Sequence, residues 1–176
     1  PGEGIKVELV EESALSGEPA NPDRPLRYRA IVNCGKAVKD MTIEVRDHDG
    51  SILPDRKIGK VWCTGPSLMK EYFRDEQATI DCMTDGWLDT GDMGYLSNGY
   101  IFIVGRAKDM IIINGKNHWP QDIEWAVEQL PGFKQGDIAA FAVTTPSGEE
   151  LPAVLVQCRT TDDGERTALR EKIRDK

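Results

Sequence analysis

The dipeptide Asn98-Gly99 constrains the fold of this chain more than any other feature. Asn-Gly favours the two-residue turn of a β-hairpin, because that turn needs positive φ at both central positions. Apolar, strand-like runs flank the dipeptide at 95–96 and 100–104. The sequence therefore predicts an antiparallel hairpin centred on this turn.

The predicted hairpin brings a carboxylate and a guanidinium to its open end. Pairing outward from the turn places Asp92 opposite Gly105, with Arg106 one step beyond. In a strictly regular strand Arg106 would point to the other face, so we expect the strand to end at Gly105. The Asp92 carboxylate could then bind a vicinal diol such as a ribose, through hydrogen bonds of about 1.5–3 kcal/mol each. The alternative is an ordinary surface ion pair, which is worth ~0–1 kcal/mol.

The rest of the pattern predicts an α+β chain whose first part is mostly β. A helix should begin at Pro120 and end before Pro131-Gly132. The character of the chain changes near 105–109, and a Pro-rich loop or insertion is expected at 16–27. The other expected elements are strands at 5–10, 29–34, 41–47, 60–64, 110–113, 137–144 and 151–157, a turn at 114–117, a helix at 165–173, and short helical turns at 68–73 and 76–79.

The net charge argues against a nucleic-acid partner, and the short apolar runs argue against a membrane span. The 176 residues carry a net charge of −8, which argues against a nucleic-acid surface. No apolar run approaches the ~20 residues of a membrane span, so no transmembrane segment is expected. The residues Pro1-Gly2-Glu3-Gly4 resemble neither a signal peptide nor a natural start, and we interpret the chain as a piece of a longer one.

The four cysteines are far apart and have no neighbouring histidines, so no metal site is expected. Cys34, Cys63 and Cys158 lie in apolar, strand-like runs. They are expected to be buried, reduced thiols, which fits a cytoplasmic protein.

Two motifs resemble those of a known superfamily. The segment Trp87-Leu-Asp-Thr-Gly-Asp92 precedes the hairpin, and Gly105-Arg-Ala-Lys-Asp109 and then Ile-Ile-Ile-Asn-Gly115 follow it. In this order they resemble the adenylate-forming (ANL) superfamily, which includes acyl-CoA synthetases, luciferases and non-ribosomal peptide adenylation domains. The resemblance covers about residues 30–160.

Within that superfamily, residues 117–124 and 32–35 look most like fatty acyl-AMP ligases, with long-chain fatty acyl-CoA synthetases next. The segment 58–65 also resembles the family, but the Gly-Tyr-Trp turn that follows is altered here to Glu71-Tyr72-Phe73. The family often has Glu where Lys60 stands. These departures weaken the local match and leave the two motifs intact.

The resemblance implies a fold in two parts. Residues 1–104 would end a large N-terminal domain as a distorted antiparallel β-barrel subdomain, with an insertion at about 5–30. Residues 105–109 would form a hinge, and residues 110–176 a truncated α+β C-terminal domain.

The resemblance also implies roles for single residues. Asp92 and Arg106 would bind the nucleotide, Lys108 would be the hinge, and Gly115 and Lys116 would lie on the loop that faces the acyl acceptor. The cofactors would be ATP and Mg²⁺. The substrate would be a fatty acid, and the acceptor an acyl carrier protein or coenzyme A.

Several parts of the machinery are missing from this sequence. The Ser/Thr/Gly-rich phosphate loop is absent, and the family's catalytic lysine would lie beyond residue 176. His118 could be a general base, although a role in the turn before the helix is favoured. We therefore expect no catalytic residue here and no activity of the fragment alone. The alternatives to a fatty acyl-AMP ligase are a coenzyme A ligase and a non-catalytic, β-rich interaction module.

Overall fold

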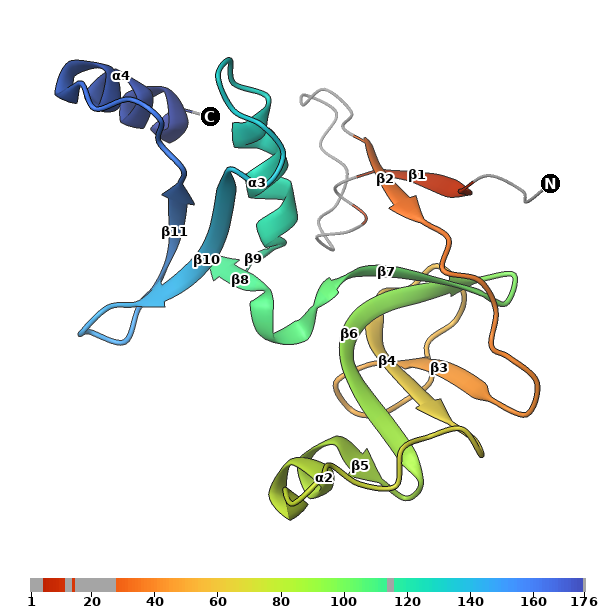
Figure 1. Ribbon diagram of the computed structural model, residues 1–176. Helices are drawn as coiled ribbons and strands as arrows, with labels where there is room; N and C mark the ends of the chain where they lie inside the picture. Colours follow the sequence, from red (N-terminus) through yellow and green to blue (C-terminus); the bar gives the residue numbers. More distant parts are fainter. Residues whose placement is uncertain (1–4, 12–13, 15–27, 114–115, 176) are drawn as a thin grey trace. The chain divides into compact units, whose positions relative to one another are not determined.

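The computed structural model describes residues 5–11, 14, 28–113 and 116–175 (Figure 1). The chain divides into two compact units, Pro1–Lys108 and Asp109–Lys176. The division falls inside residues 105–109, and each unit has its own sheets and buried residues. It stays a prediction that the first unit is the end of a larger domain and that the second unit is a truncated domain. The expected loop at 16–27 lies outside the described residues.

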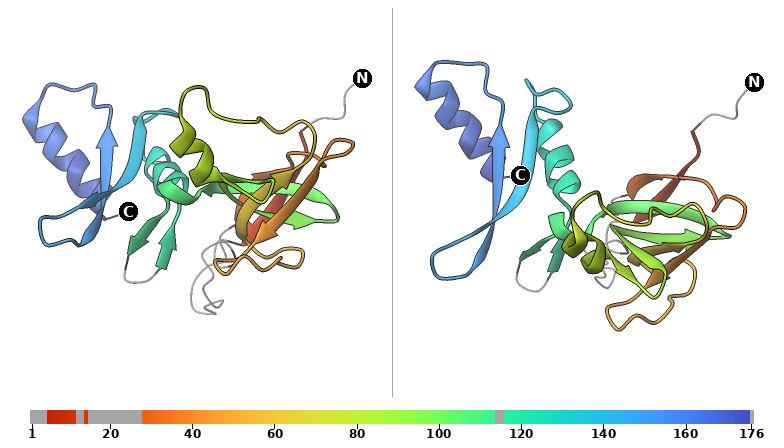
Figure 2. Two further views of the ribbon diagram at one scale, coloured as in Figure 1. Left: turned by 90° about the horizontal axis from the view of Figure 1, so that it is seen from below. Right: turned by 60° about the horizontal axis from the view of Figure 1, so that its bottom comes forward.

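The first unit is built on one antiparallel sheet. Its order is β3-β4-β6-β5, and β7 also pairs with β6. β6 is eleven residues long and bends strongly, so the sheet curls and different parts of β6 pair with different strands (Figures 1 and 2). The strands are β3 (Thr42–Arg46), β4 (Gly59–Thr64), β5 (Met83–Thr84), β6 (Trp87–Ser97) and β7 (Tyr100–Arg106).

The predicted hairpin is confirmed as β6 and β7. Asn98 and Gly99 form its turn with φ values of 51° and 76°, the positive region that this turn requires. Ser97 and Tyr100 are the first pair on either side.

One face of the curled sheet forms the core of this unit. Val45, Val61 and Ile101 are buried there, because alternate residues of a strand point to the same face. Half-buried apolar side chains surround them, namely Ile43, Leu53, Leu96 and Ile103.

The opposite face carries a cation held between two indoles. The Arg46 guanidinium lies 5.0 Å from the ring centre of Trp62 and 4.3 Å from that of Trp87. Its Nε and Nη2 also donate to Glu44 Oε2 at 2.9 and 2.7 Å. The cluster therefore joins β3, β4 and β6 on the side away from the core.

A separate hairpin, β1 (Val7–Glu11) with β2 (Tyr28–Val32), belongs to the same unit. Both strands were expected, but the expected burial of the second is wrong. Ile31 is 2% exposed whereas Val32 is 48% exposed, so the hairpin covers the rest of the unit with one face only. Tyr95 donates to Glu8 Oε2 at 3.0 Å, and burial raises the pKa of this tyrosine above its usual range.

The described residues of the second unit form two short sheets and two helices. The turn expected at 114–117 is wrong at its end, because residues 116 and 117 belong to strand β9. The sequence Lys-Asn-His of this strand is polar, so it lacked the apolar pattern that would have predicted a strand. The elements are β8 (Ile111–Ile113), β9 (Lys116–His118), α3 (Pro120–Glu128), β10 (Ile138–Thr144), β11 (Glu150–Val156) and α4 (Asp163–Arg174).

Helix α3 begins at Pro120 as predicted and packs against β10 (Figure 2). Proline suits this first position because its missing N–H would have no partner within the helix. Trp119, just before it, is 2% exposed, and Val127 of the helix is 3% exposed. Glu124 Oε1 accepts the Ala140 N–H at 3.0 Å, which ties the helix to the strand.

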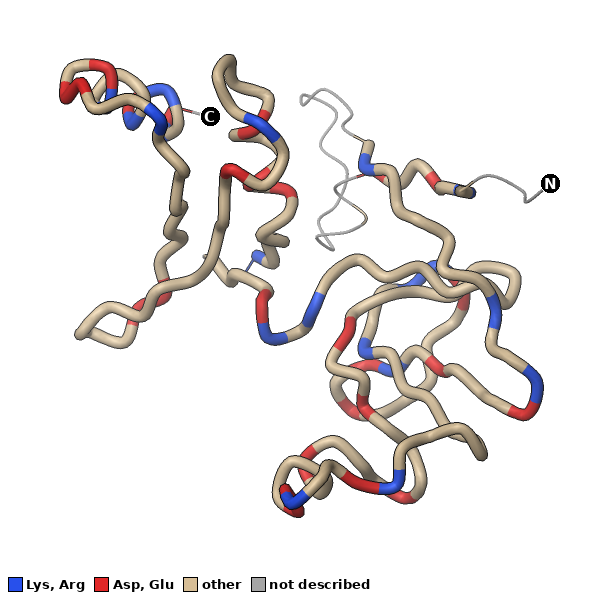
Figure 3. Tube along the Cα trace, viewed as in Figure 1, with Lys and Arg blue, Asp and Glu red and all other residues tan. Residues whose placement is uncertain are grey.

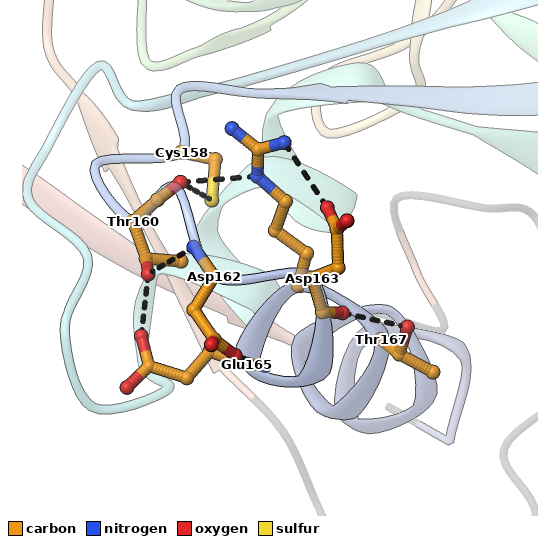
Figure 4. Close-up of polar contacts among 7 residues, drawn as sticks. Cys158, Thr160, Asp162, Asp163, Glu165 and Thr167 are labelled. Carbon is orange, nitrogen blue, oxygen red and sulfur yellow. Dashed lines mark hydrogen bonds and ion pairs between the residues drawn. The ribbon is translucent and has the colours of Figure 1, made fainter.

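Helix α4 has an N-terminal cap at Asp162, which Figure 4 shows among its polar neighbours. Asp162 Oδ1 accepts the Glu165 N–H at 2.8 Å. The Glu165 side chain in turn accepts from Thr160 Oγ1, so the cap is fixed from both sides. Acidic residues in the first turn also favour the positive end of the helix dipole.

The fold class α+β is confirmed, with some local predictions wrong. A short helix α2 (Glu76–Cys82) replaces the helical turn expected at 76–79, while 68–73 forms turns and bends without a helix. Its last two residues, Tyr72 and Phe73, are 47% and 85% exposed, so this end of the segment does not pack as an apolar helix face would. Cys34 and Cys158 are exposed rather than buried, because the strands end before they reach them.

The distribution of charge and the length of the helices bear on the partners expected from the sequence. Lys and Arg are distributed along the described chain and alternate with Asp and Glu rather than gathering in one stretch (Figure 3). Among the described residues, no helix is long and apolar enough to cross a membrane.

We predict that Arg46→Met lowers the free energy of unfolding by roughly 1–3 kcal/mol, because it removes two cation–π contacts and leaves Glu44 without its cation. Urea unfolding of the chain, followed by tryptophan fluorescence, measures this. Lys36→Met is the matched control, since exposed Lys36 lies over the Tyr100 ring at 4.4 Å and should matter by less than about 0.5 kcal/mol. Equal effects of both changes would contradict the assignment.

A second prediction concerns pH. The Arg159 guanidinium binds the Asp137 carboxylate through two contacts of 2.5 and 2.6 Å and lowers the pKa of Asp137 to about 2, below its ordinary 3.8. Stability from this pair is therefore complete above the ordinary value and is lost as the pH falls from 3.8 towards 2.

Asp137→Asn should accordingly be less stable than the natural chain at neutral pH, and the two should converge in acid. Thermal melts from pH 6 to about pH 2 would record this, and Arg159→Met should converge in the same way. A stability difference that stays constant over this range would count against the pair.

Candidate functional site

Asp92 and Arg106 lie directly opposite each other in β6 and β7. Arg106 Nε is 3.4 Å from Asp92 Oδ1, which makes an ion pair. The Asp92 side chain is 33% exposed and the Arg106 side chain 52% exposed. Both groups therefore face solvent at the end of the hairpin, where a ligand could reach them.

The pairing differs from the one expected. Gly94 pairs with Ile103, but Met93 pairs with Gly105, so Val104 is an extra residue in β7. Such a β-bulge shifts the register by one. The strand continues through Arg106 instead of ending at Gly105, and the bulge turns Arg106 to the face of Asp92.

A second irregularity lies on the other side of Asp92. Lys60 of β4 pairs with Met93, and Trp62 pairs with Asp89, so the tripeptide 90–92 stands opposite Val61 alone. Asp92 therefore lies between two irregular pairings, one with β4 and one with β7.

Hydrogen bonds fix the tripeptide in this form. Thr90 Oγ1 donates to the Val61 carbonyl at 2.9 Å and accepts the Asp92 N–H at 3.1 Å. Arg106 Nη2 donates to the Thr90 carbonyl at 3.1 Å. Arg106 thus holds the backbone of the tripeptide as well as its carboxylate.

Gly91 meets two requirements at once. Its φ of +72° belongs to the left-handed region, which strains residues with a side chain. A Cβ here would also stand 3.1 Å from Arg106 Nη2. Glycine therefore leaves the space that the guanidinium occupies.

Asp89 was not singled out from the sequence. Its Oδ1 accepts the Gly91 N–H at 2.9 Å, and its Oδ2 lies 3.2 Å from Lys60 Nζ. An aspartate two residues before a glycine is a known turn-forming pattern, and this spacing could have identified it.

The other predicted residues lie elsewhere. Lys108 is exposed in the short 3-10 helix Ala107–Asp109, where the two units divide. Lys116 is exposed in β9, and Gly115 lies outside the described residues. His118 ends β9 and pairs with Ile111, so it stands immediately before Trp119 and the helix.

One group of side chains in the described residues has the spacing of metal ligands, namely Asp47, His48 and Asp49. It lies in an exposed turn, and Asp47 Oδ1 already accepts two backbone N–H groups of that turn, at 2.8 and 3.0 Å. The His48 side chain is 89% exposed. The arrangement is explained by the turn itself.

Chemically, the site offers an acceptor beside a cation. A carboxylate can accept hydrogen bonds from neighbouring hydroxyls, and a guanidinium can bind an anionic oxygen. The exposed pair by itself would add only ~0–1 kcal/mol to stability. Gly91 and the irregular pairings of β6 with β4 and β7 lie next to Asp92 and Arg106 and fix how these two side chains are placed.

Comparison with known proteins identifies the family. No family model matches the chain. A provisionally named acyl-CoA synthetase of Caulobacter vibrioides is 42% identical over 177 residues, which cover 98% of this chain and 31% of that protein.

Two solved structures are also similar. One comes from a study of fatty acyl-adenylate ligases from E. coli and L. pneumophila, with a TM-score of 0.81, 39% identity, and coverage of 97% of this chain and 31% of that one. The other is McyG A-PCP complexed with phenylalanyl-adenylate, with a TM-score of 0.72, 34% identity, and coverage of 84% and 27%.

The chain thus spans about a third of the length of the relatives it matches. The matched region covers nearly the whole chain and therefore extends along both units. The chain belongs to the adenylate-forming superfamily, and fatty acyl-adenylate ligases are among its similar structures.

Proposed function

We propose that the full-length protein activates a fatty acid as an acyl-adenylate and passes the acyl group to the thiol of an acyl carrier protein. In the first step a carboxylate oxygen of the fatty acid attacks the α-phosphorus of ATP, and pyrophosphate leaves. In the second step the thiol sulfur attacks the acyl carbonyl, and AMP leaves. The observation that carries the proposal is the Asp92–Arg106 pair, held at one end of the hairpin by two irregular pairings.

Asp92 would bind the ribose of ATP and of the adenylate. Its carboxylate can accept both hydroxyls of a vicinal diol, each hydrogen bond being worth roughly 1.5–3 kcal/mol. Arg106 holds that carboxylate in place through their ion pair, and would support the same ribose or the phosphate. Mg²⁺ bound with the ATP would offset the charge that develops on the leaving pyrophosphate.

Lys108 would be the hinge between the two parts of the enzyme. A hinge absorbs a change of φ and ψ at a few residues, and this position lies at the division between the two compact units. Gly115 and Lys116 would then belong to the loop that faces the acyl acceptor.

The acceptor has two candidates. The sequence resemblance to fatty acyl-AMP ligases supports a carrier protein, and similarity to fatty acyl-adenylate ligases at 39% identity over nearly the whole chain agrees with that resemblance. The name of the Caulobacter relative, an acyl-CoA synthetase, favours coenzyme A instead. A non-catalytic module is the less favoured alternative, because nothing in the geometry around Asp92 suggests it.

We predict that Asp92→Ala in the full-length enzyme raises the KM for ATP by about 100-fold or more, because two hydrogen bonds to a charged group are lost. Pyrophosphate release with saturating fatty acid measures this. The 176-residue chain alone, assayed beside the enzyme, should release none, since it has no phosphate loop.

Asp85→Asn is the matched control for that experiment. It removes the same charge from an exposed turn, where φ is +50° and asparagine is tolerated. An unchanged KM for ATP in Asp92→Ala would remove Asp92 from the nucleotide site, and so would an equal rise in both variants.

The acceptor is tested by adding coenzyme A or an acyl carrier protein to the full-length enzyme with ATP and a fatty acid. The proposal expects acyl-carrier protein to form, and little or no acyl-CoA, when each product is measured by mass spectrometry. Efficient acyl-CoA formation without carrier acylation would establish the alternative acceptor.

A further inference from the structure

Arg29 lies on the inner face of the β1–β2 hairpin. Val10 pairs with Arg29 and Glu8 pairs with Ile31, so these four residues share one face. Ile31 of this face is 2% exposed, whereas Leu9 of the other face is 68% exposed. The face with Arg29 is therefore the one packed against the rest of the first unit.

The guanidinium of Arg29 reaches the bulge in β7. Arg29 Nη2 donates to the Val104 carbonyl at 3.1 Å, across 75 residues of chain. Val104 is the extra residue of the bulge and is 2% exposed. The extra residue of a bulge lies outside the regular pairing, and a buried carbonyl needs a partner. Arg29 supplies one.

The position of this bond connects the hairpin to the candidate site. Val104 stands two residues before Arg106, and its insertion is what turns Arg106 to the face of Asp92. A bond that fixes the carbonyl of Val104 therefore fixes the part of the backbone that aims Arg106. Asn33 also bridges to Phe102, so β2 follows β7 up to the bulge.

We propose that Arg29 is a positioning residue of the nucleotide site, acting through the Val104 bulge to hold Arg106 beside Asp92. The β1–β2 hairpin would then help to hold Arg106 and Asp92 in the arrangement that binds ATP. This inference rests on the proposed function of the Asp92–Arg106 pair. Arg29 itself contacts no reacting group.

A second attachment of the same hairpin gives the control. Glu8 accepts from Tyr95 at 3.0 Å and pairs with Arg56 Nη2 at 2.5 Å. These contacts hold the hairpin without touching the bulge. Weakening them with Glu8→Gln loosens the hairpin by another route, so an effect limited to Arg29 must come from its bond to Val104.

The experiment measures pyrophosphate release by full-length Arg29→Met, which keeps the aliphatic stem and removes the donor. We expect the KM for ATP to rise by about 5- to 20-fold, with the KM for the fatty acid unchanged. Arg29→Lys, which keeps a charged N–H donor, should recover most of this loss. Glu8→Gln should stay within about twofold of the natural enzyme.

A double-mutant cycle with Arg106→Ala tests the route of the effect. If Arg29 acts by aiming Arg106, Arg29→Met should add nothing in the Arg106→Ala background. Additive effects on the KM for ATP would overturn the proposal, and so would equal effects of Arg29→Met and Glu8→Gln. If thermal melting shows that Arg29→Met does not fold, Arg29→Gln takes its place in the cycle, because its shorter side chain loses the bond to Val104 but keeps a polar end. It is judged by the same additivity.

The outcomes separate this inference from the proposed function. If Asp92→Ala raises the KM for ATP and Arg29→Met does not, the nucleotide site stands and the positioning role is wrong. If neither variant changes that KM, the nucleotide site itself is wrong, and the positioning role is wrong with it.

Discussion

One extra residue in β7 determines how the candidate site is arranged. If Val104 were paired in register with Met93, Gly105 would face Asp92, and Arg106 would point to the other side of the sheet. The bulge brings the two charged groups to 3.4 Å, and Gly91 leaves the room that the guanidinium needs. The remaining contacts, from Thr90, Asp89 and Arg29, hold the backbone on either side of this pair.

The sequence could predict what depends on local chemistry. Asn98-Gly99 predicted the hairpin, and Pro120 predicted the start of α3, because each residue type has a strong conformational preference. The bulge at Val104 could not be read in the same way, since a valine in an apolar strand carries no sign that it will stand outside the pairing. The motifs nevertheless indicated that Asp92 and Arg106 belong together, and the bulge explains how a continuous strand allows it.

The sequence predicted less well which side chains are buried, because burial depends on residues that are distant in the chain. The run 29–34 is apolar enough for a buried strand, yet β2 packs through one face only. That face carries Arg29 and Ile31, and it gives the hairpin its connection to β7. The residues that face away from the sheet, such as Leu9 and Val32, are exposed although they are as apolar as their buried neighbours.

We propose that Asp92 and Arg106 form the nucleotide side of an adenylate-forming enzyme. A crystal structure of the full-length enzyme with a non-hydrolysable acyl-adenylate analogue tests this role. Both ribose hydroxyls should lie about 2.7–3.0 Å from the Asp92 carboxylate, with Arg106 still paired to it. An analogue bound in a defined site away from Asp92, beyond hydrogen-bond distance of its carboxylate, would contradict this role.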